Sequence, residues 1–297
     1  MRVPFFIISL ILIVNGFSQD LVPKKSIFDK EVELSIDYLM TTMSQSEGNN
    51  LEVDTSEFLS YKVMVSPQMN DNYTISINEF IPRLELSNLE ALNTLYHDFI
   101  KEQKYDLECD LGMSNPKINN IKYIYGLAEK YKPKIDKIKT NIFMYPNDNM
   151  VYYKDVSIPD EKFEIVDKCI LLVSPIFDGY DVDISKEYEY PHEVKLSYLN
   201  TLFNDTLFYK TKSISNRIQE IEISFYSDSG EINNALKELK ELEKREGSIN
   251  DFEMFNCIKY NIDKASGKII GIIINSGMTS SSDKYEMKIE YRINYSG

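Results

Sequence analysis

Side chains suited to acid–base chemistry are scarce in this chain of 297 residues, which has only two histidines. His192 lies in a predicted loop between Glu189 and Glu193. Two carboxylates so near to the imidazole would raise its pKa. His192 is therefore the candidate base of a carboxylate-based hydrolase with a site between two modules, although no nucleophile pattern lies near it. His97 lies on a predicted helix, where we interpret it as a solvated surface residue.

One group of carboxylates has a spacing that suits a cation. Asp181 and Asp183 would point to the same side of a strand, and Asp178 comes just before them. An EF-hand loop needs its glycine at the sixth position, and here the glycine falls at the second. The group leaves open a loose Ca²⁺ site in a calcium-stabilised adhesion module, as an alternative to a plain solvated strand face. No other cofactor is predicted, since phosphate-binding glycine loops and a three-histidine zinc set are both absent from the sequence.

The charge balance narrows the function classes further. The chain has 47 Asp and Glu against 33 Lys and Arg, for a formal net charge of −14. A nucleic-acid-binding protein needs a basic surface patch, so we expect no nucleic acid partner. The sequence also lacks the Gly-x-Ser-x-Gly motif of α/β-hydrolases. Together with the scarcity of histidine, this favours binding over catalysis.

The first 18 residues predict an export signal. Arg2 precedes an apolar run of about ten residues, and the small residues Gly16 and Ser18 suit cleavage after Ser18. A membrane-spanning helix needs about 20 apolar residues, and no later stretch reaches that length. We therefore expect a periplasmic or extracellular protein with no transmembrane segment after leader removal. An uncleaved N-terminal anchor is the alternative interpretation.

The predicted location makes the three cysteines informative. Cys109, Cys169 and Cys257 each lie in an apolar run typical of a strand, at residues 106–111, 165–173 and 252–260. In an oxidising compartment, an odd number of cysteines leaves at least one thiol outside any internal disulfide. We interpret all three as buried free thiols, and one disulfide or a reactive thiol remain as alternatives.

Hydrophobic patterning predicts an α+β fold. A helix is expected over residues 26–44, with a turn cluster at residues 46–50. They are followed by strands at residues 63–67, which end in Ser-Pro, and 73–77, an amphipathic helix near residues 89–100, a strand from residue 106, a second helix over residues 121–131 and a last strand at residues 141–145. The corresponding strands of the second half are residues 171–175 and 180–184, and of its two helices the first contains Leu196 and Phe203 and the second begins near residue 236. This order recurs in the second half, where the segments of residues 63–67, 73–77, 92–98 and 106–120 match residues 171–175, 180–184, 199–205 and 220–234. The collinear order of the matches predicts duplicated modules, and a chance likeness of two unrelated segments is the alternative.

The C-terminal end carries the clearest periodic pattern. Residues 285–295 alternate strictly, with Tyr, Met and Ile side chains on one side and charged or Asn side chains on the other. A period of two predicts a strand with one buried and one solvated face. The segment of residues 261–268 before it predicts a turn between strands, in which Gly267 adopts a positive φ. We expect the Ser-rich residues 276–282 to form a loop, and the last strand could pair with a partner at a sheet edge.

Two segments resemble SIMPL-domain proteins, a family of exported bacterial envelope proteins. The first is Asn70 to Phe80 followed by a long amphipathic helix, and the second is Ile221 to Phe225 followed by the helix that begins near Ala235. The resemblance covers about a third of the chain and implies an α+β fold, an envelope location and self-assembly. It implies no catalytic residues.

These patterns together predict four segments and one class of function. The segments are a signal peptide (residues 1–18), an N-terminal helix and turn (19–48), and two tandem α+β modules of antiparallel sheet with amphipathic helices (49–157 and 158–297). The second module ends in a β-hairpin. The predicted function is non-enzymatic binding or self-association outside the cytoplasm, with a second copy or an envelope protein as partner.

Overall fold

The computed structural model describes residues 28, 30–46, 51–68, 72–110, 116–144, 152–154, 156, 158–178, 188–196, 201–227, 253–279 and 283–296. Within these residues the fold is α+β, as predicted, and strands dominate it. The three described helices are α2 (Glu90–Glu102), α3 (Ile121–Met144) and α4 (Lys162–Asp178). None of the described helices is long and apolar enough to cross a membrane.

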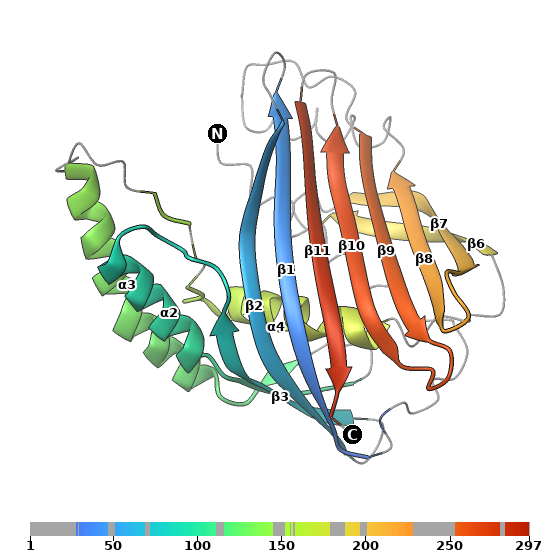
Figure 1. Cartoon of the computed structure of the whole chain (residues 1–297), viewed down its shortest axis with the longest axis horizontal. Coiled ribbons are helices and arrows are strands. Elements are labelled where there is room, and N and C mark those ends of the chain that lie inside the picture. Colours follow the sequence, from blue (N-terminus) through green and yellow to red (C-terminus); the bar gives the residue numbers. More distant parts are fainter. Residues whose placement is uncertain are drawn as a thin grey trace. The chain divides into compact units, whose positions relative to one another are not determined.

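The strands form one hydrogen-bonded series with order β5-β4-β3-β2-β1-β11-β10-β9-β8-β7-β6 (Figure 1). Every neighbouring pair with a defined register in the described residues is antiparallel. The strands are β1 (Val32–Ser46), β2 (Glu52–Pro67), β3 (Asn72–Pro82), β4 (Tyr105–Asp110), β5 (Lys117–Ile118), β6 (Tyr188–Leu196), β7 (Thr201–Ser213), β8 (Ile218–Ser227), β9 (Glu253–Asp263), β10 (Ile269–Thr279) and β11 (Asp283–Tyr295).

The described chain divides into two compact units, neither of which is continuous in sequence. Unit 1 contains Leu39–Thr55 and Asp178–Arg292, and therefore the strands β6 to β10 and most of β11. Unit 2 contains Lys24–Tyr38, Ser56–Phe177 and Ile293–Gly297. All three described helices lie in unit 2 except for the last residue of α4.

The strands of unit 2 bury every second side chain. Val65 of β2 lies opposite Ile75 of β3, which lies opposite Leu107 of β4, and all three are fully buried. This alternation places one side of each strand in the core, where each large apolar side chain contributes about 1.5–3 kcal/mol to folding. Strand β3 changes phase at Glu79, a non-glycine residue with φ of 53°, so that Phe80 also points into the core. The register between β2 and β3 shifts beside it, which identifies a β-bulge.

Helix α4 packs on β2 mainly through apolar side chains. Five of its buried residues follow helical spacing and have exposed fractions of 0%: Ile165, Cys169, Leu172, Val173 and Ile176. Two polar contacts join the same elements, since Tyr61 Oη donates a hydrogen bond of 2.8 Å to the Leu172 carbonyl and Lys168 Nζ lies 2.9 Å from a Glu57 oxygen. The sequence was expected to form strands over residues 165–173 and 171–175. The structure corrects this to a helix, because spacings of three and four bury the same apolar residues on one side.

Helices α2 and α3 are held together by a carboxylate at the end of α2. Glu102 accepts hydrogen bonds from Lys130 Nζ (2.7 Å) and from Tyr131 Oη (2.8 Å), both on α3. Lys130 and Tyr131 lower the pKa of the Glu102 carboxyl through these bonds. The predicted helix over residues 121–131 is confirmed, but it continues through Pro133 to Met144 and replaces the strand expected at residues 141–145.

We expect Glu102 to make unit 2 less stable in acid. A carboxyl with a lowered pKa in the folded state stabilises the protein above its unfolded pKa, near 4.5, and this contribution is lost as the pH falls through the folded pKa. Glu102→Gln should therefore flatten the dependence of urea unfolding on pH below about 4.5. The control is Glu129→Gln, which removes the charge of a different exposed carboxylate, on α3. An unchanged acid dependence in Glu102→Gln would contradict the assignment.

Unit 1 is a sheet in which side-by-side residues form transverse rows on the buried side. One row is Tyr291, Ile272, Tyr260 and Ile221, and the next is Ile289, Ile274, Ile258 and Ile223. Seven of these eight residues are buried, and Ile223 is half-buried. The other side is polar and carries ion pairs between neighbours, such as Lys259 with Glu222 at 2.9 Å. The predicted one-sided burial of residues 285–295 and the turn with Gly267 (φ 67°) are confirmed.

Several other predictions are wrong. The helix expected over residues 26–44 is strand β1 from Val32 onward, where alternate residues Leu34, Ile36 and Tyr38 are buried. Leu196 and Phe203 were expected on a helix and belong to β6 and β7. Ser276, Gly277 and Thr279 are part of β10 and not of a loop. The last strand, β11, lies between β1 and β10 and not at an edge.

These differences bear on the predicted duplication. The first Ser-Pro segment ends strand β2, whereas the matching Ser174 and Pro175 lie in helix α4. Residues 92–98 are helical, whereas the described part of the matching segment is strand β7. The described residues therefore show no duplicated modules. The expected helix near residue 236 and the strand at residues 180–184 lie outside the described residues.

The environments of the thiols agree with their interpretation as small apolar residues. Cys169 is a fully buried free thiol in α4, Cys257 is a half-buried free thiol in β9, and Cys109 is buried in β4. Burial raises the pKa of Cys257 to about 11 and that of Cys169 further above its usual value.

We therefore expect slow alkylation of Cys169 and Cys257 in the folded protein. The thiolate is the reactive form, and a pKa of about 11 leaves roughly one thiolate in a thousand at pH 8. Mass spectrometry after treatment with iodoacetamide should show little modification of either residue without denaturant and complete modification in urea. Rapid labelling of the native protein would contradict this burial.

Candidate functional site

The structure separates the residues that the sequence singled out. His97 lies on α2 with Nε2 3.2 Å from the Leu84 carbonyl oxygen, which ties it to the segment before the helix. His192 lies on strand β6, not in a loop, and its side chain is outside the described part. Asp178 ends α4, and Asp181 and Asp183 lie outside the described residues. Within the described residues, no three His, Cys, Asp or Glu side chains are grouped as a metal site.

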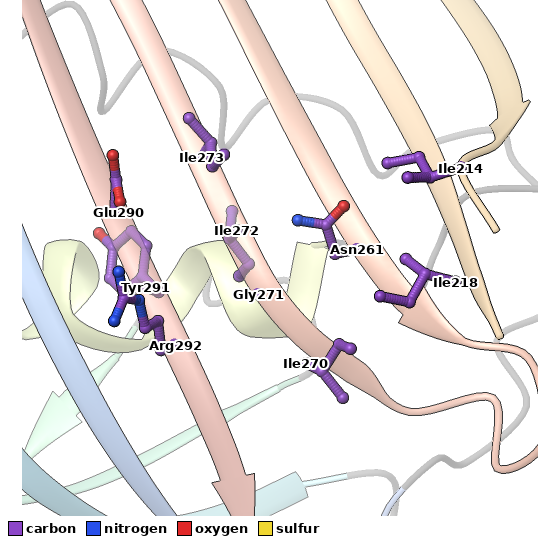
Figure 2. A pocket seen from close by; sticks show the side chains of 10 residues that line it. All are labelled: Ile214, Ile218, Asn261, Ile270, Gly271, Ile272, Ile273, Glu290, Tyr291 and Arg292. Carbon is purple, nitrogen blue, oxygen red and sulfur yellow. The ribbon is translucent and has the colours of Figure 1, made fainter.

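A groove on the polar side of the unit 1 sheet has the features of a small binding site. Figure 2 shows its lining, which comes from β8, β9, β10 and β11 and from the β7–β8 connection. Its volume is about 350 Å³, at the lower end of the range for small-molecule sites. Five isoleucines line it, and four of them supply its apolar walls, since Ile272 is fully buried: Ile214, Ile218, Ile270 and Ile273. We call this the Gly271 groove, after the residue at its floor.

The groove is hollow because its floor lacks side chains. Gly271 has no side chain, and a Cβ there would lie 3.4 Å from the Tyr291 carbonyl oxygen and 3.6 Å from Asn261 Nδ2. Gly277 lies on the same side of β10, but the Phe255 ring covers it so closely that a Cβ would lie 2.5 Å from the ring. The residue paired with Gly271 is Asn261, whose side chain is shorter than that of Phe255. The space above Gly277 is therefore filled by a ring, whereas the space above Gly271 is left open.

Polar groups are few in the groove. The Asn261 Oδ1 atom is shielded from solvent and accepts no hydrogen bond from the described residues. Glu290 and Arg292 project from the same side of β11, and the Glu290 carboxylate forms an ion pair with Lys288. A buried acceptor without a donor is costly, by about 1–3 kcal/mol. The groove therefore offers an apolar surface with charges of both signs around it, and the one unused acceptor of its lining, Asn261 Oδ1, lies beneath that surface.

A second cavity lies in unit 2 beside α3. It has a volume of about 540 Å³ and is lined by Tyr125, Ala128, Glu129, Lys132, Pro133, Asp136 and Asp160. Its lysine is already engaged, because Lys132 Nζ donates to the Asp160 carboxylate and lowers the pKa of that carboxyl. No unpartnered buried polar atom among the described residues belongs to this lining. We therefore take the Gly271 groove as the better candidate.

Comparisons with known proteins add no assignment. No family model matches the chain, and no curated protein matches its sequence. One similar solved structure is described as lipid–protein interactions in lipovitellin, with 10% identity and a TM-score of 0.37 over 93% of this chain. The chain spans 25% of the lipovitellin chain. Another is a polyisoprenoid-binding domain from Saccharophagus degradans implicated in plant cell wall breakdown, with 6% identity, a TM-score of 0.16, and coverage of 88% of this chain and 98% of that one. Both likenesses are too weak to establish a shared fold or a shared ligand.

Sequence reasoning missed the groove entirely. Its residues come from segments around positions 214, 261, 271 and 291, and none of them forms a local motif. The one visible signal was Gly271, a glycine within a run of isoleucines that otherwise reads as a strand. A glycine inside a strand marks a bulge or a close approach of another group, and the register between β9 and β10 does shift between Ile269 and Gly271.

Proposed function

We propose that this chain is an exported, non-enzymatic binding protein that holds a small amphipathic molecule in the Gly271 groove. The observation that carries the proposal is the combination of four isoleucines with one shielded amide oxygen that lacks a donor. Apolar walls with a small number of placed polar groups are typical of ligand sites. The export signal predicted over residues 1–18 supports a periplasmic or extracellular place of action.

The groove chemistry favours a neutral ligand with an apolar body and a hydrogen-bond donor. Asn261 Oδ1 requires a donor such as an alcohol or an amide N–H. Glu290 and Arg292 carry opposite charges, so the rim selects neither an anion nor a cation by net charge. The isoleucines would gain about 25 cal/mol for each Å² of apolar surface that the ligand removes from water.

Binding of 1-octanol and octanamide, measured by saturation-transfer NMR and calorimetry, tests this assignment. We expect both neutral probes to bind more tightly than octanoate or octylamine. Gly271→Val should weaken binding at least about tenfold, or about 1.4 kcal/mol, because its methyl groups occupy the floor of the groove. A β-branched residue suits a strand, and the nearest atom to a Cβ there is at 3.4 Å, so the variant should fold.

The matched control is another glycine-to-larger change that lies in unit 2. Gly126 is an exposed residue of α3 with no atom within 4 Å of a Cβ position, so Gly126→Ala should leave binding unchanged. Binding that survives in a folded Gly271→Val protein would overturn the assignment of the groove. Equal binding of neutral and charged probes would overturn the choice of ligand class.

Self-association was the other form of this prediction, and its proposed route was edge pairing of the last strand. Strand β11 has neighbours on both sides, β1 and β10, so it has no open edge for a partner. This observation favours small-molecule binding. Sedimentation of the mature protein measures its oligomeric state. A stable dimer that octanol does not change would favour self-association over small-molecule binding as the function.

A further inference from the structure

The cavity beside α3 in unit 2 is lined by the acidic residues of that helix. Helix α3 carries six lysines but only two acidic residues, Glu129 and Asp136. Both acidic residues line the cavity, whereas Lys132 is the one lysine of the six that does so. Asp160, from the segment before α4, adds a third carboxylate. We call this cavity the α3 pocket, and three carboxylates with one ammonium group give its lining a formal charge of −2.

Two of the three carboxylates have no partner in the part of the chain that the structure describes. Lys132 forms its ion pair with Asp160, so its charge is already engaged. Glu129 and Asp136 form no ion pair and no side-chain hydrogen bond with another described residue. Asp160, and to a smaller extent Asp136, raise the pKa of the Lys132 ammonium group, which indicates that the pocket favours positive charge.

The backbone of α3 adds an acceptor on the same side. Pro133 lies inside the helix and has no N–H, so the carbonyl of Glu129, four residues earlier, lacks its usual helical donor. Glu129 and Pro133 both line the α3 pocket, which places this acceptor on the pocket side of the helix. A backbone carbonyl needs a donor, and an N–H of a ligand can supply it here.

The spacing of the two unpaired carboxylates limits the shape of a ligand. Glu129 and Asp136 are seven residues, or about two helical turns, apart, so they lie on nearly the same side and roughly 10 Å apart along the axis. Tyr125, Ala128 and Pro133 supply apolar surface between and beside them. The volume of about 540 Å³ is ample for one linear molecule.

We propose that the α3 pocket binds a linear molecule with an ammonium group at each end and an apolar chain of about eight carbons between them. One ammonium group pairs with Glu129 and the other with Asp136, and an N–H of the first also donates to the Glu129 carbonyl. The methylene groups lie along Ala128 and Pro133. The two positive charges match the formal charge of the lining, so this site differs in chemistry from the Gly271 groove, whose proposed ligand is neutral.

Calorimetry with 1,8-diaminooctane at low ionic strength tests this assignment. We expect this diamine to bind more tightly than 1,4-diaminobutane, which is too short to reach both carboxylates, and more tightly than octylamine, which has one ammonium group. Salt should weaken the binding, because the charges of the pocket are exposed and are screened by ions. Equal binding of the three probes would overturn the proposed spacing and charge.

Glu129→Gln combined with Asp136→Asn removes both carboxylates at almost no change in side-chain size. Each exposed ion pair is weak, so we expect about a threefold loss of affinity for either change and about a tenfold loss for both. The matched control is Glu90→Gln with Asp98→Asn, which removes the same charge from two exposed positions on α2 outside the pocket. The control should leave the affinity within about twofold, since distant exposed charges are screened.

Circular dichroism checks that both double variants fold, and Asp136→Asn alone gives the same readout if the pocket double variant does not. An equal loss of affinity in the two double variants would overturn the site, because the diamine would then respond only to net charge. Absence of binding to the unaltered protein would overturn it as well. Neither result would affect the Gly271 groove, and Gly271→Val should leave the binding of the diamine unchanged.

Discussion

Gly277→Ala should destabilise the protein by about 1–3 kcal/mol, as an overpacked position does. A Cβ at this position would lie 2.5 Å from Phe255 Cε1 and 2.9 Å from the backbone oxygen of Tyr285. The ring could rotate away, but the carbonyl belongs to the neighbouring strand and cannot move without disturbing the ladder between β10 and β11. Urea unfolding should show a lower midpoint with an unchanged slope.

A double-mutant cycle assigns this cost to its two sources. Phe255→Ala removes the ring, so alanine at position 277 should cost less in that background, with the remainder due to the Tyr285 oxygen. Gly126→Ala is the control for the change itself, and it should stabilise α3 by up to about 1 kcal/mol because glycine is a poor helix former. If Gly277→Ala were as harmless as Gly126→Ala, the close packing of Phe255 would be disproved.

Ile274→Ala and Ile273→Ala should differ sharply although the residues are adjacent. Ile274 is 1% exposed and lies between Ile258 and Ile289, so its truncation should cost about 2–5 kcal/mol. Ile273 lines the Gly271 groove and is half-buried, so its truncation should cost less than about 1 kcal/mol. Ligand affinity should follow the opposite order, with Ile273→Ala weakening the binding of octanol and Ile274→Ala leaving it intact.

This pair tests the orientation of β10 without any ligand structure. Thermal or urea unfolding gives the two stabilities, and NMR titration with octanol gives the two affinities. Equal destabilisation by the two variants would contradict the one-sided burial of β10, and a larger cost for Ile273→Ala would mean that its two sides have been exchanged. Unchanged octanol binding in Ile273→Ala would remove that residue from the groove.

The sequence predicted strands well where burial is strictly one-sided. The alternation in residues 285–295, the turn at Gly267 and helix α2 all follow from local periodicity, and the structure confirms them. The errors occurred in segments whose apolar residues fit both the helical period of 3.6 residues and the strand period of two. Val32, Ile36 and Leu39 suit a helix, but the same stretch offers Leu34, Ile36 and Tyr38 to a strand, and pairing within the sheet decided between them.

Helix α4 shows the opposite error. Residues 165–173 were predicted as a β-strand because most of them are apolar, yet they belong to a helix that buries Ile165, Cys169 and Leu172. A short apolar run cannot be assigned by period alone, because a fully buried strand and a buried helix have the same composition. The predicted duplication depended on the strand assignment of this segment, so both predictions had the same weakness.

The Gly271 groove was also not predictable from the sequence, and here the reason is different. The Gly271 groove is built from side chains that are far apart in sequence, and its hollow depends on which residue lies across from a glycine. Register is a property of pairing between strands, and it follows from the whole sheet.

The position of β1 beside β11 has a consequence for how the chain folds. The first and last described strands are neighbours, and Ser296 Oγ donates a hydrogen bond of 3.0 Å to Glu33 Oε1, across 263 positions of sequence. Contacts so distant in sequence carry a large loop-closure cost, which slows folding. The central strand β1 cannot gain its second neighbour until synthesis has reached the C-terminus. Strand β1 therefore cannot complete its pairing while the chain is still being synthesised, and the sheet closes around it only after the last strand has been made.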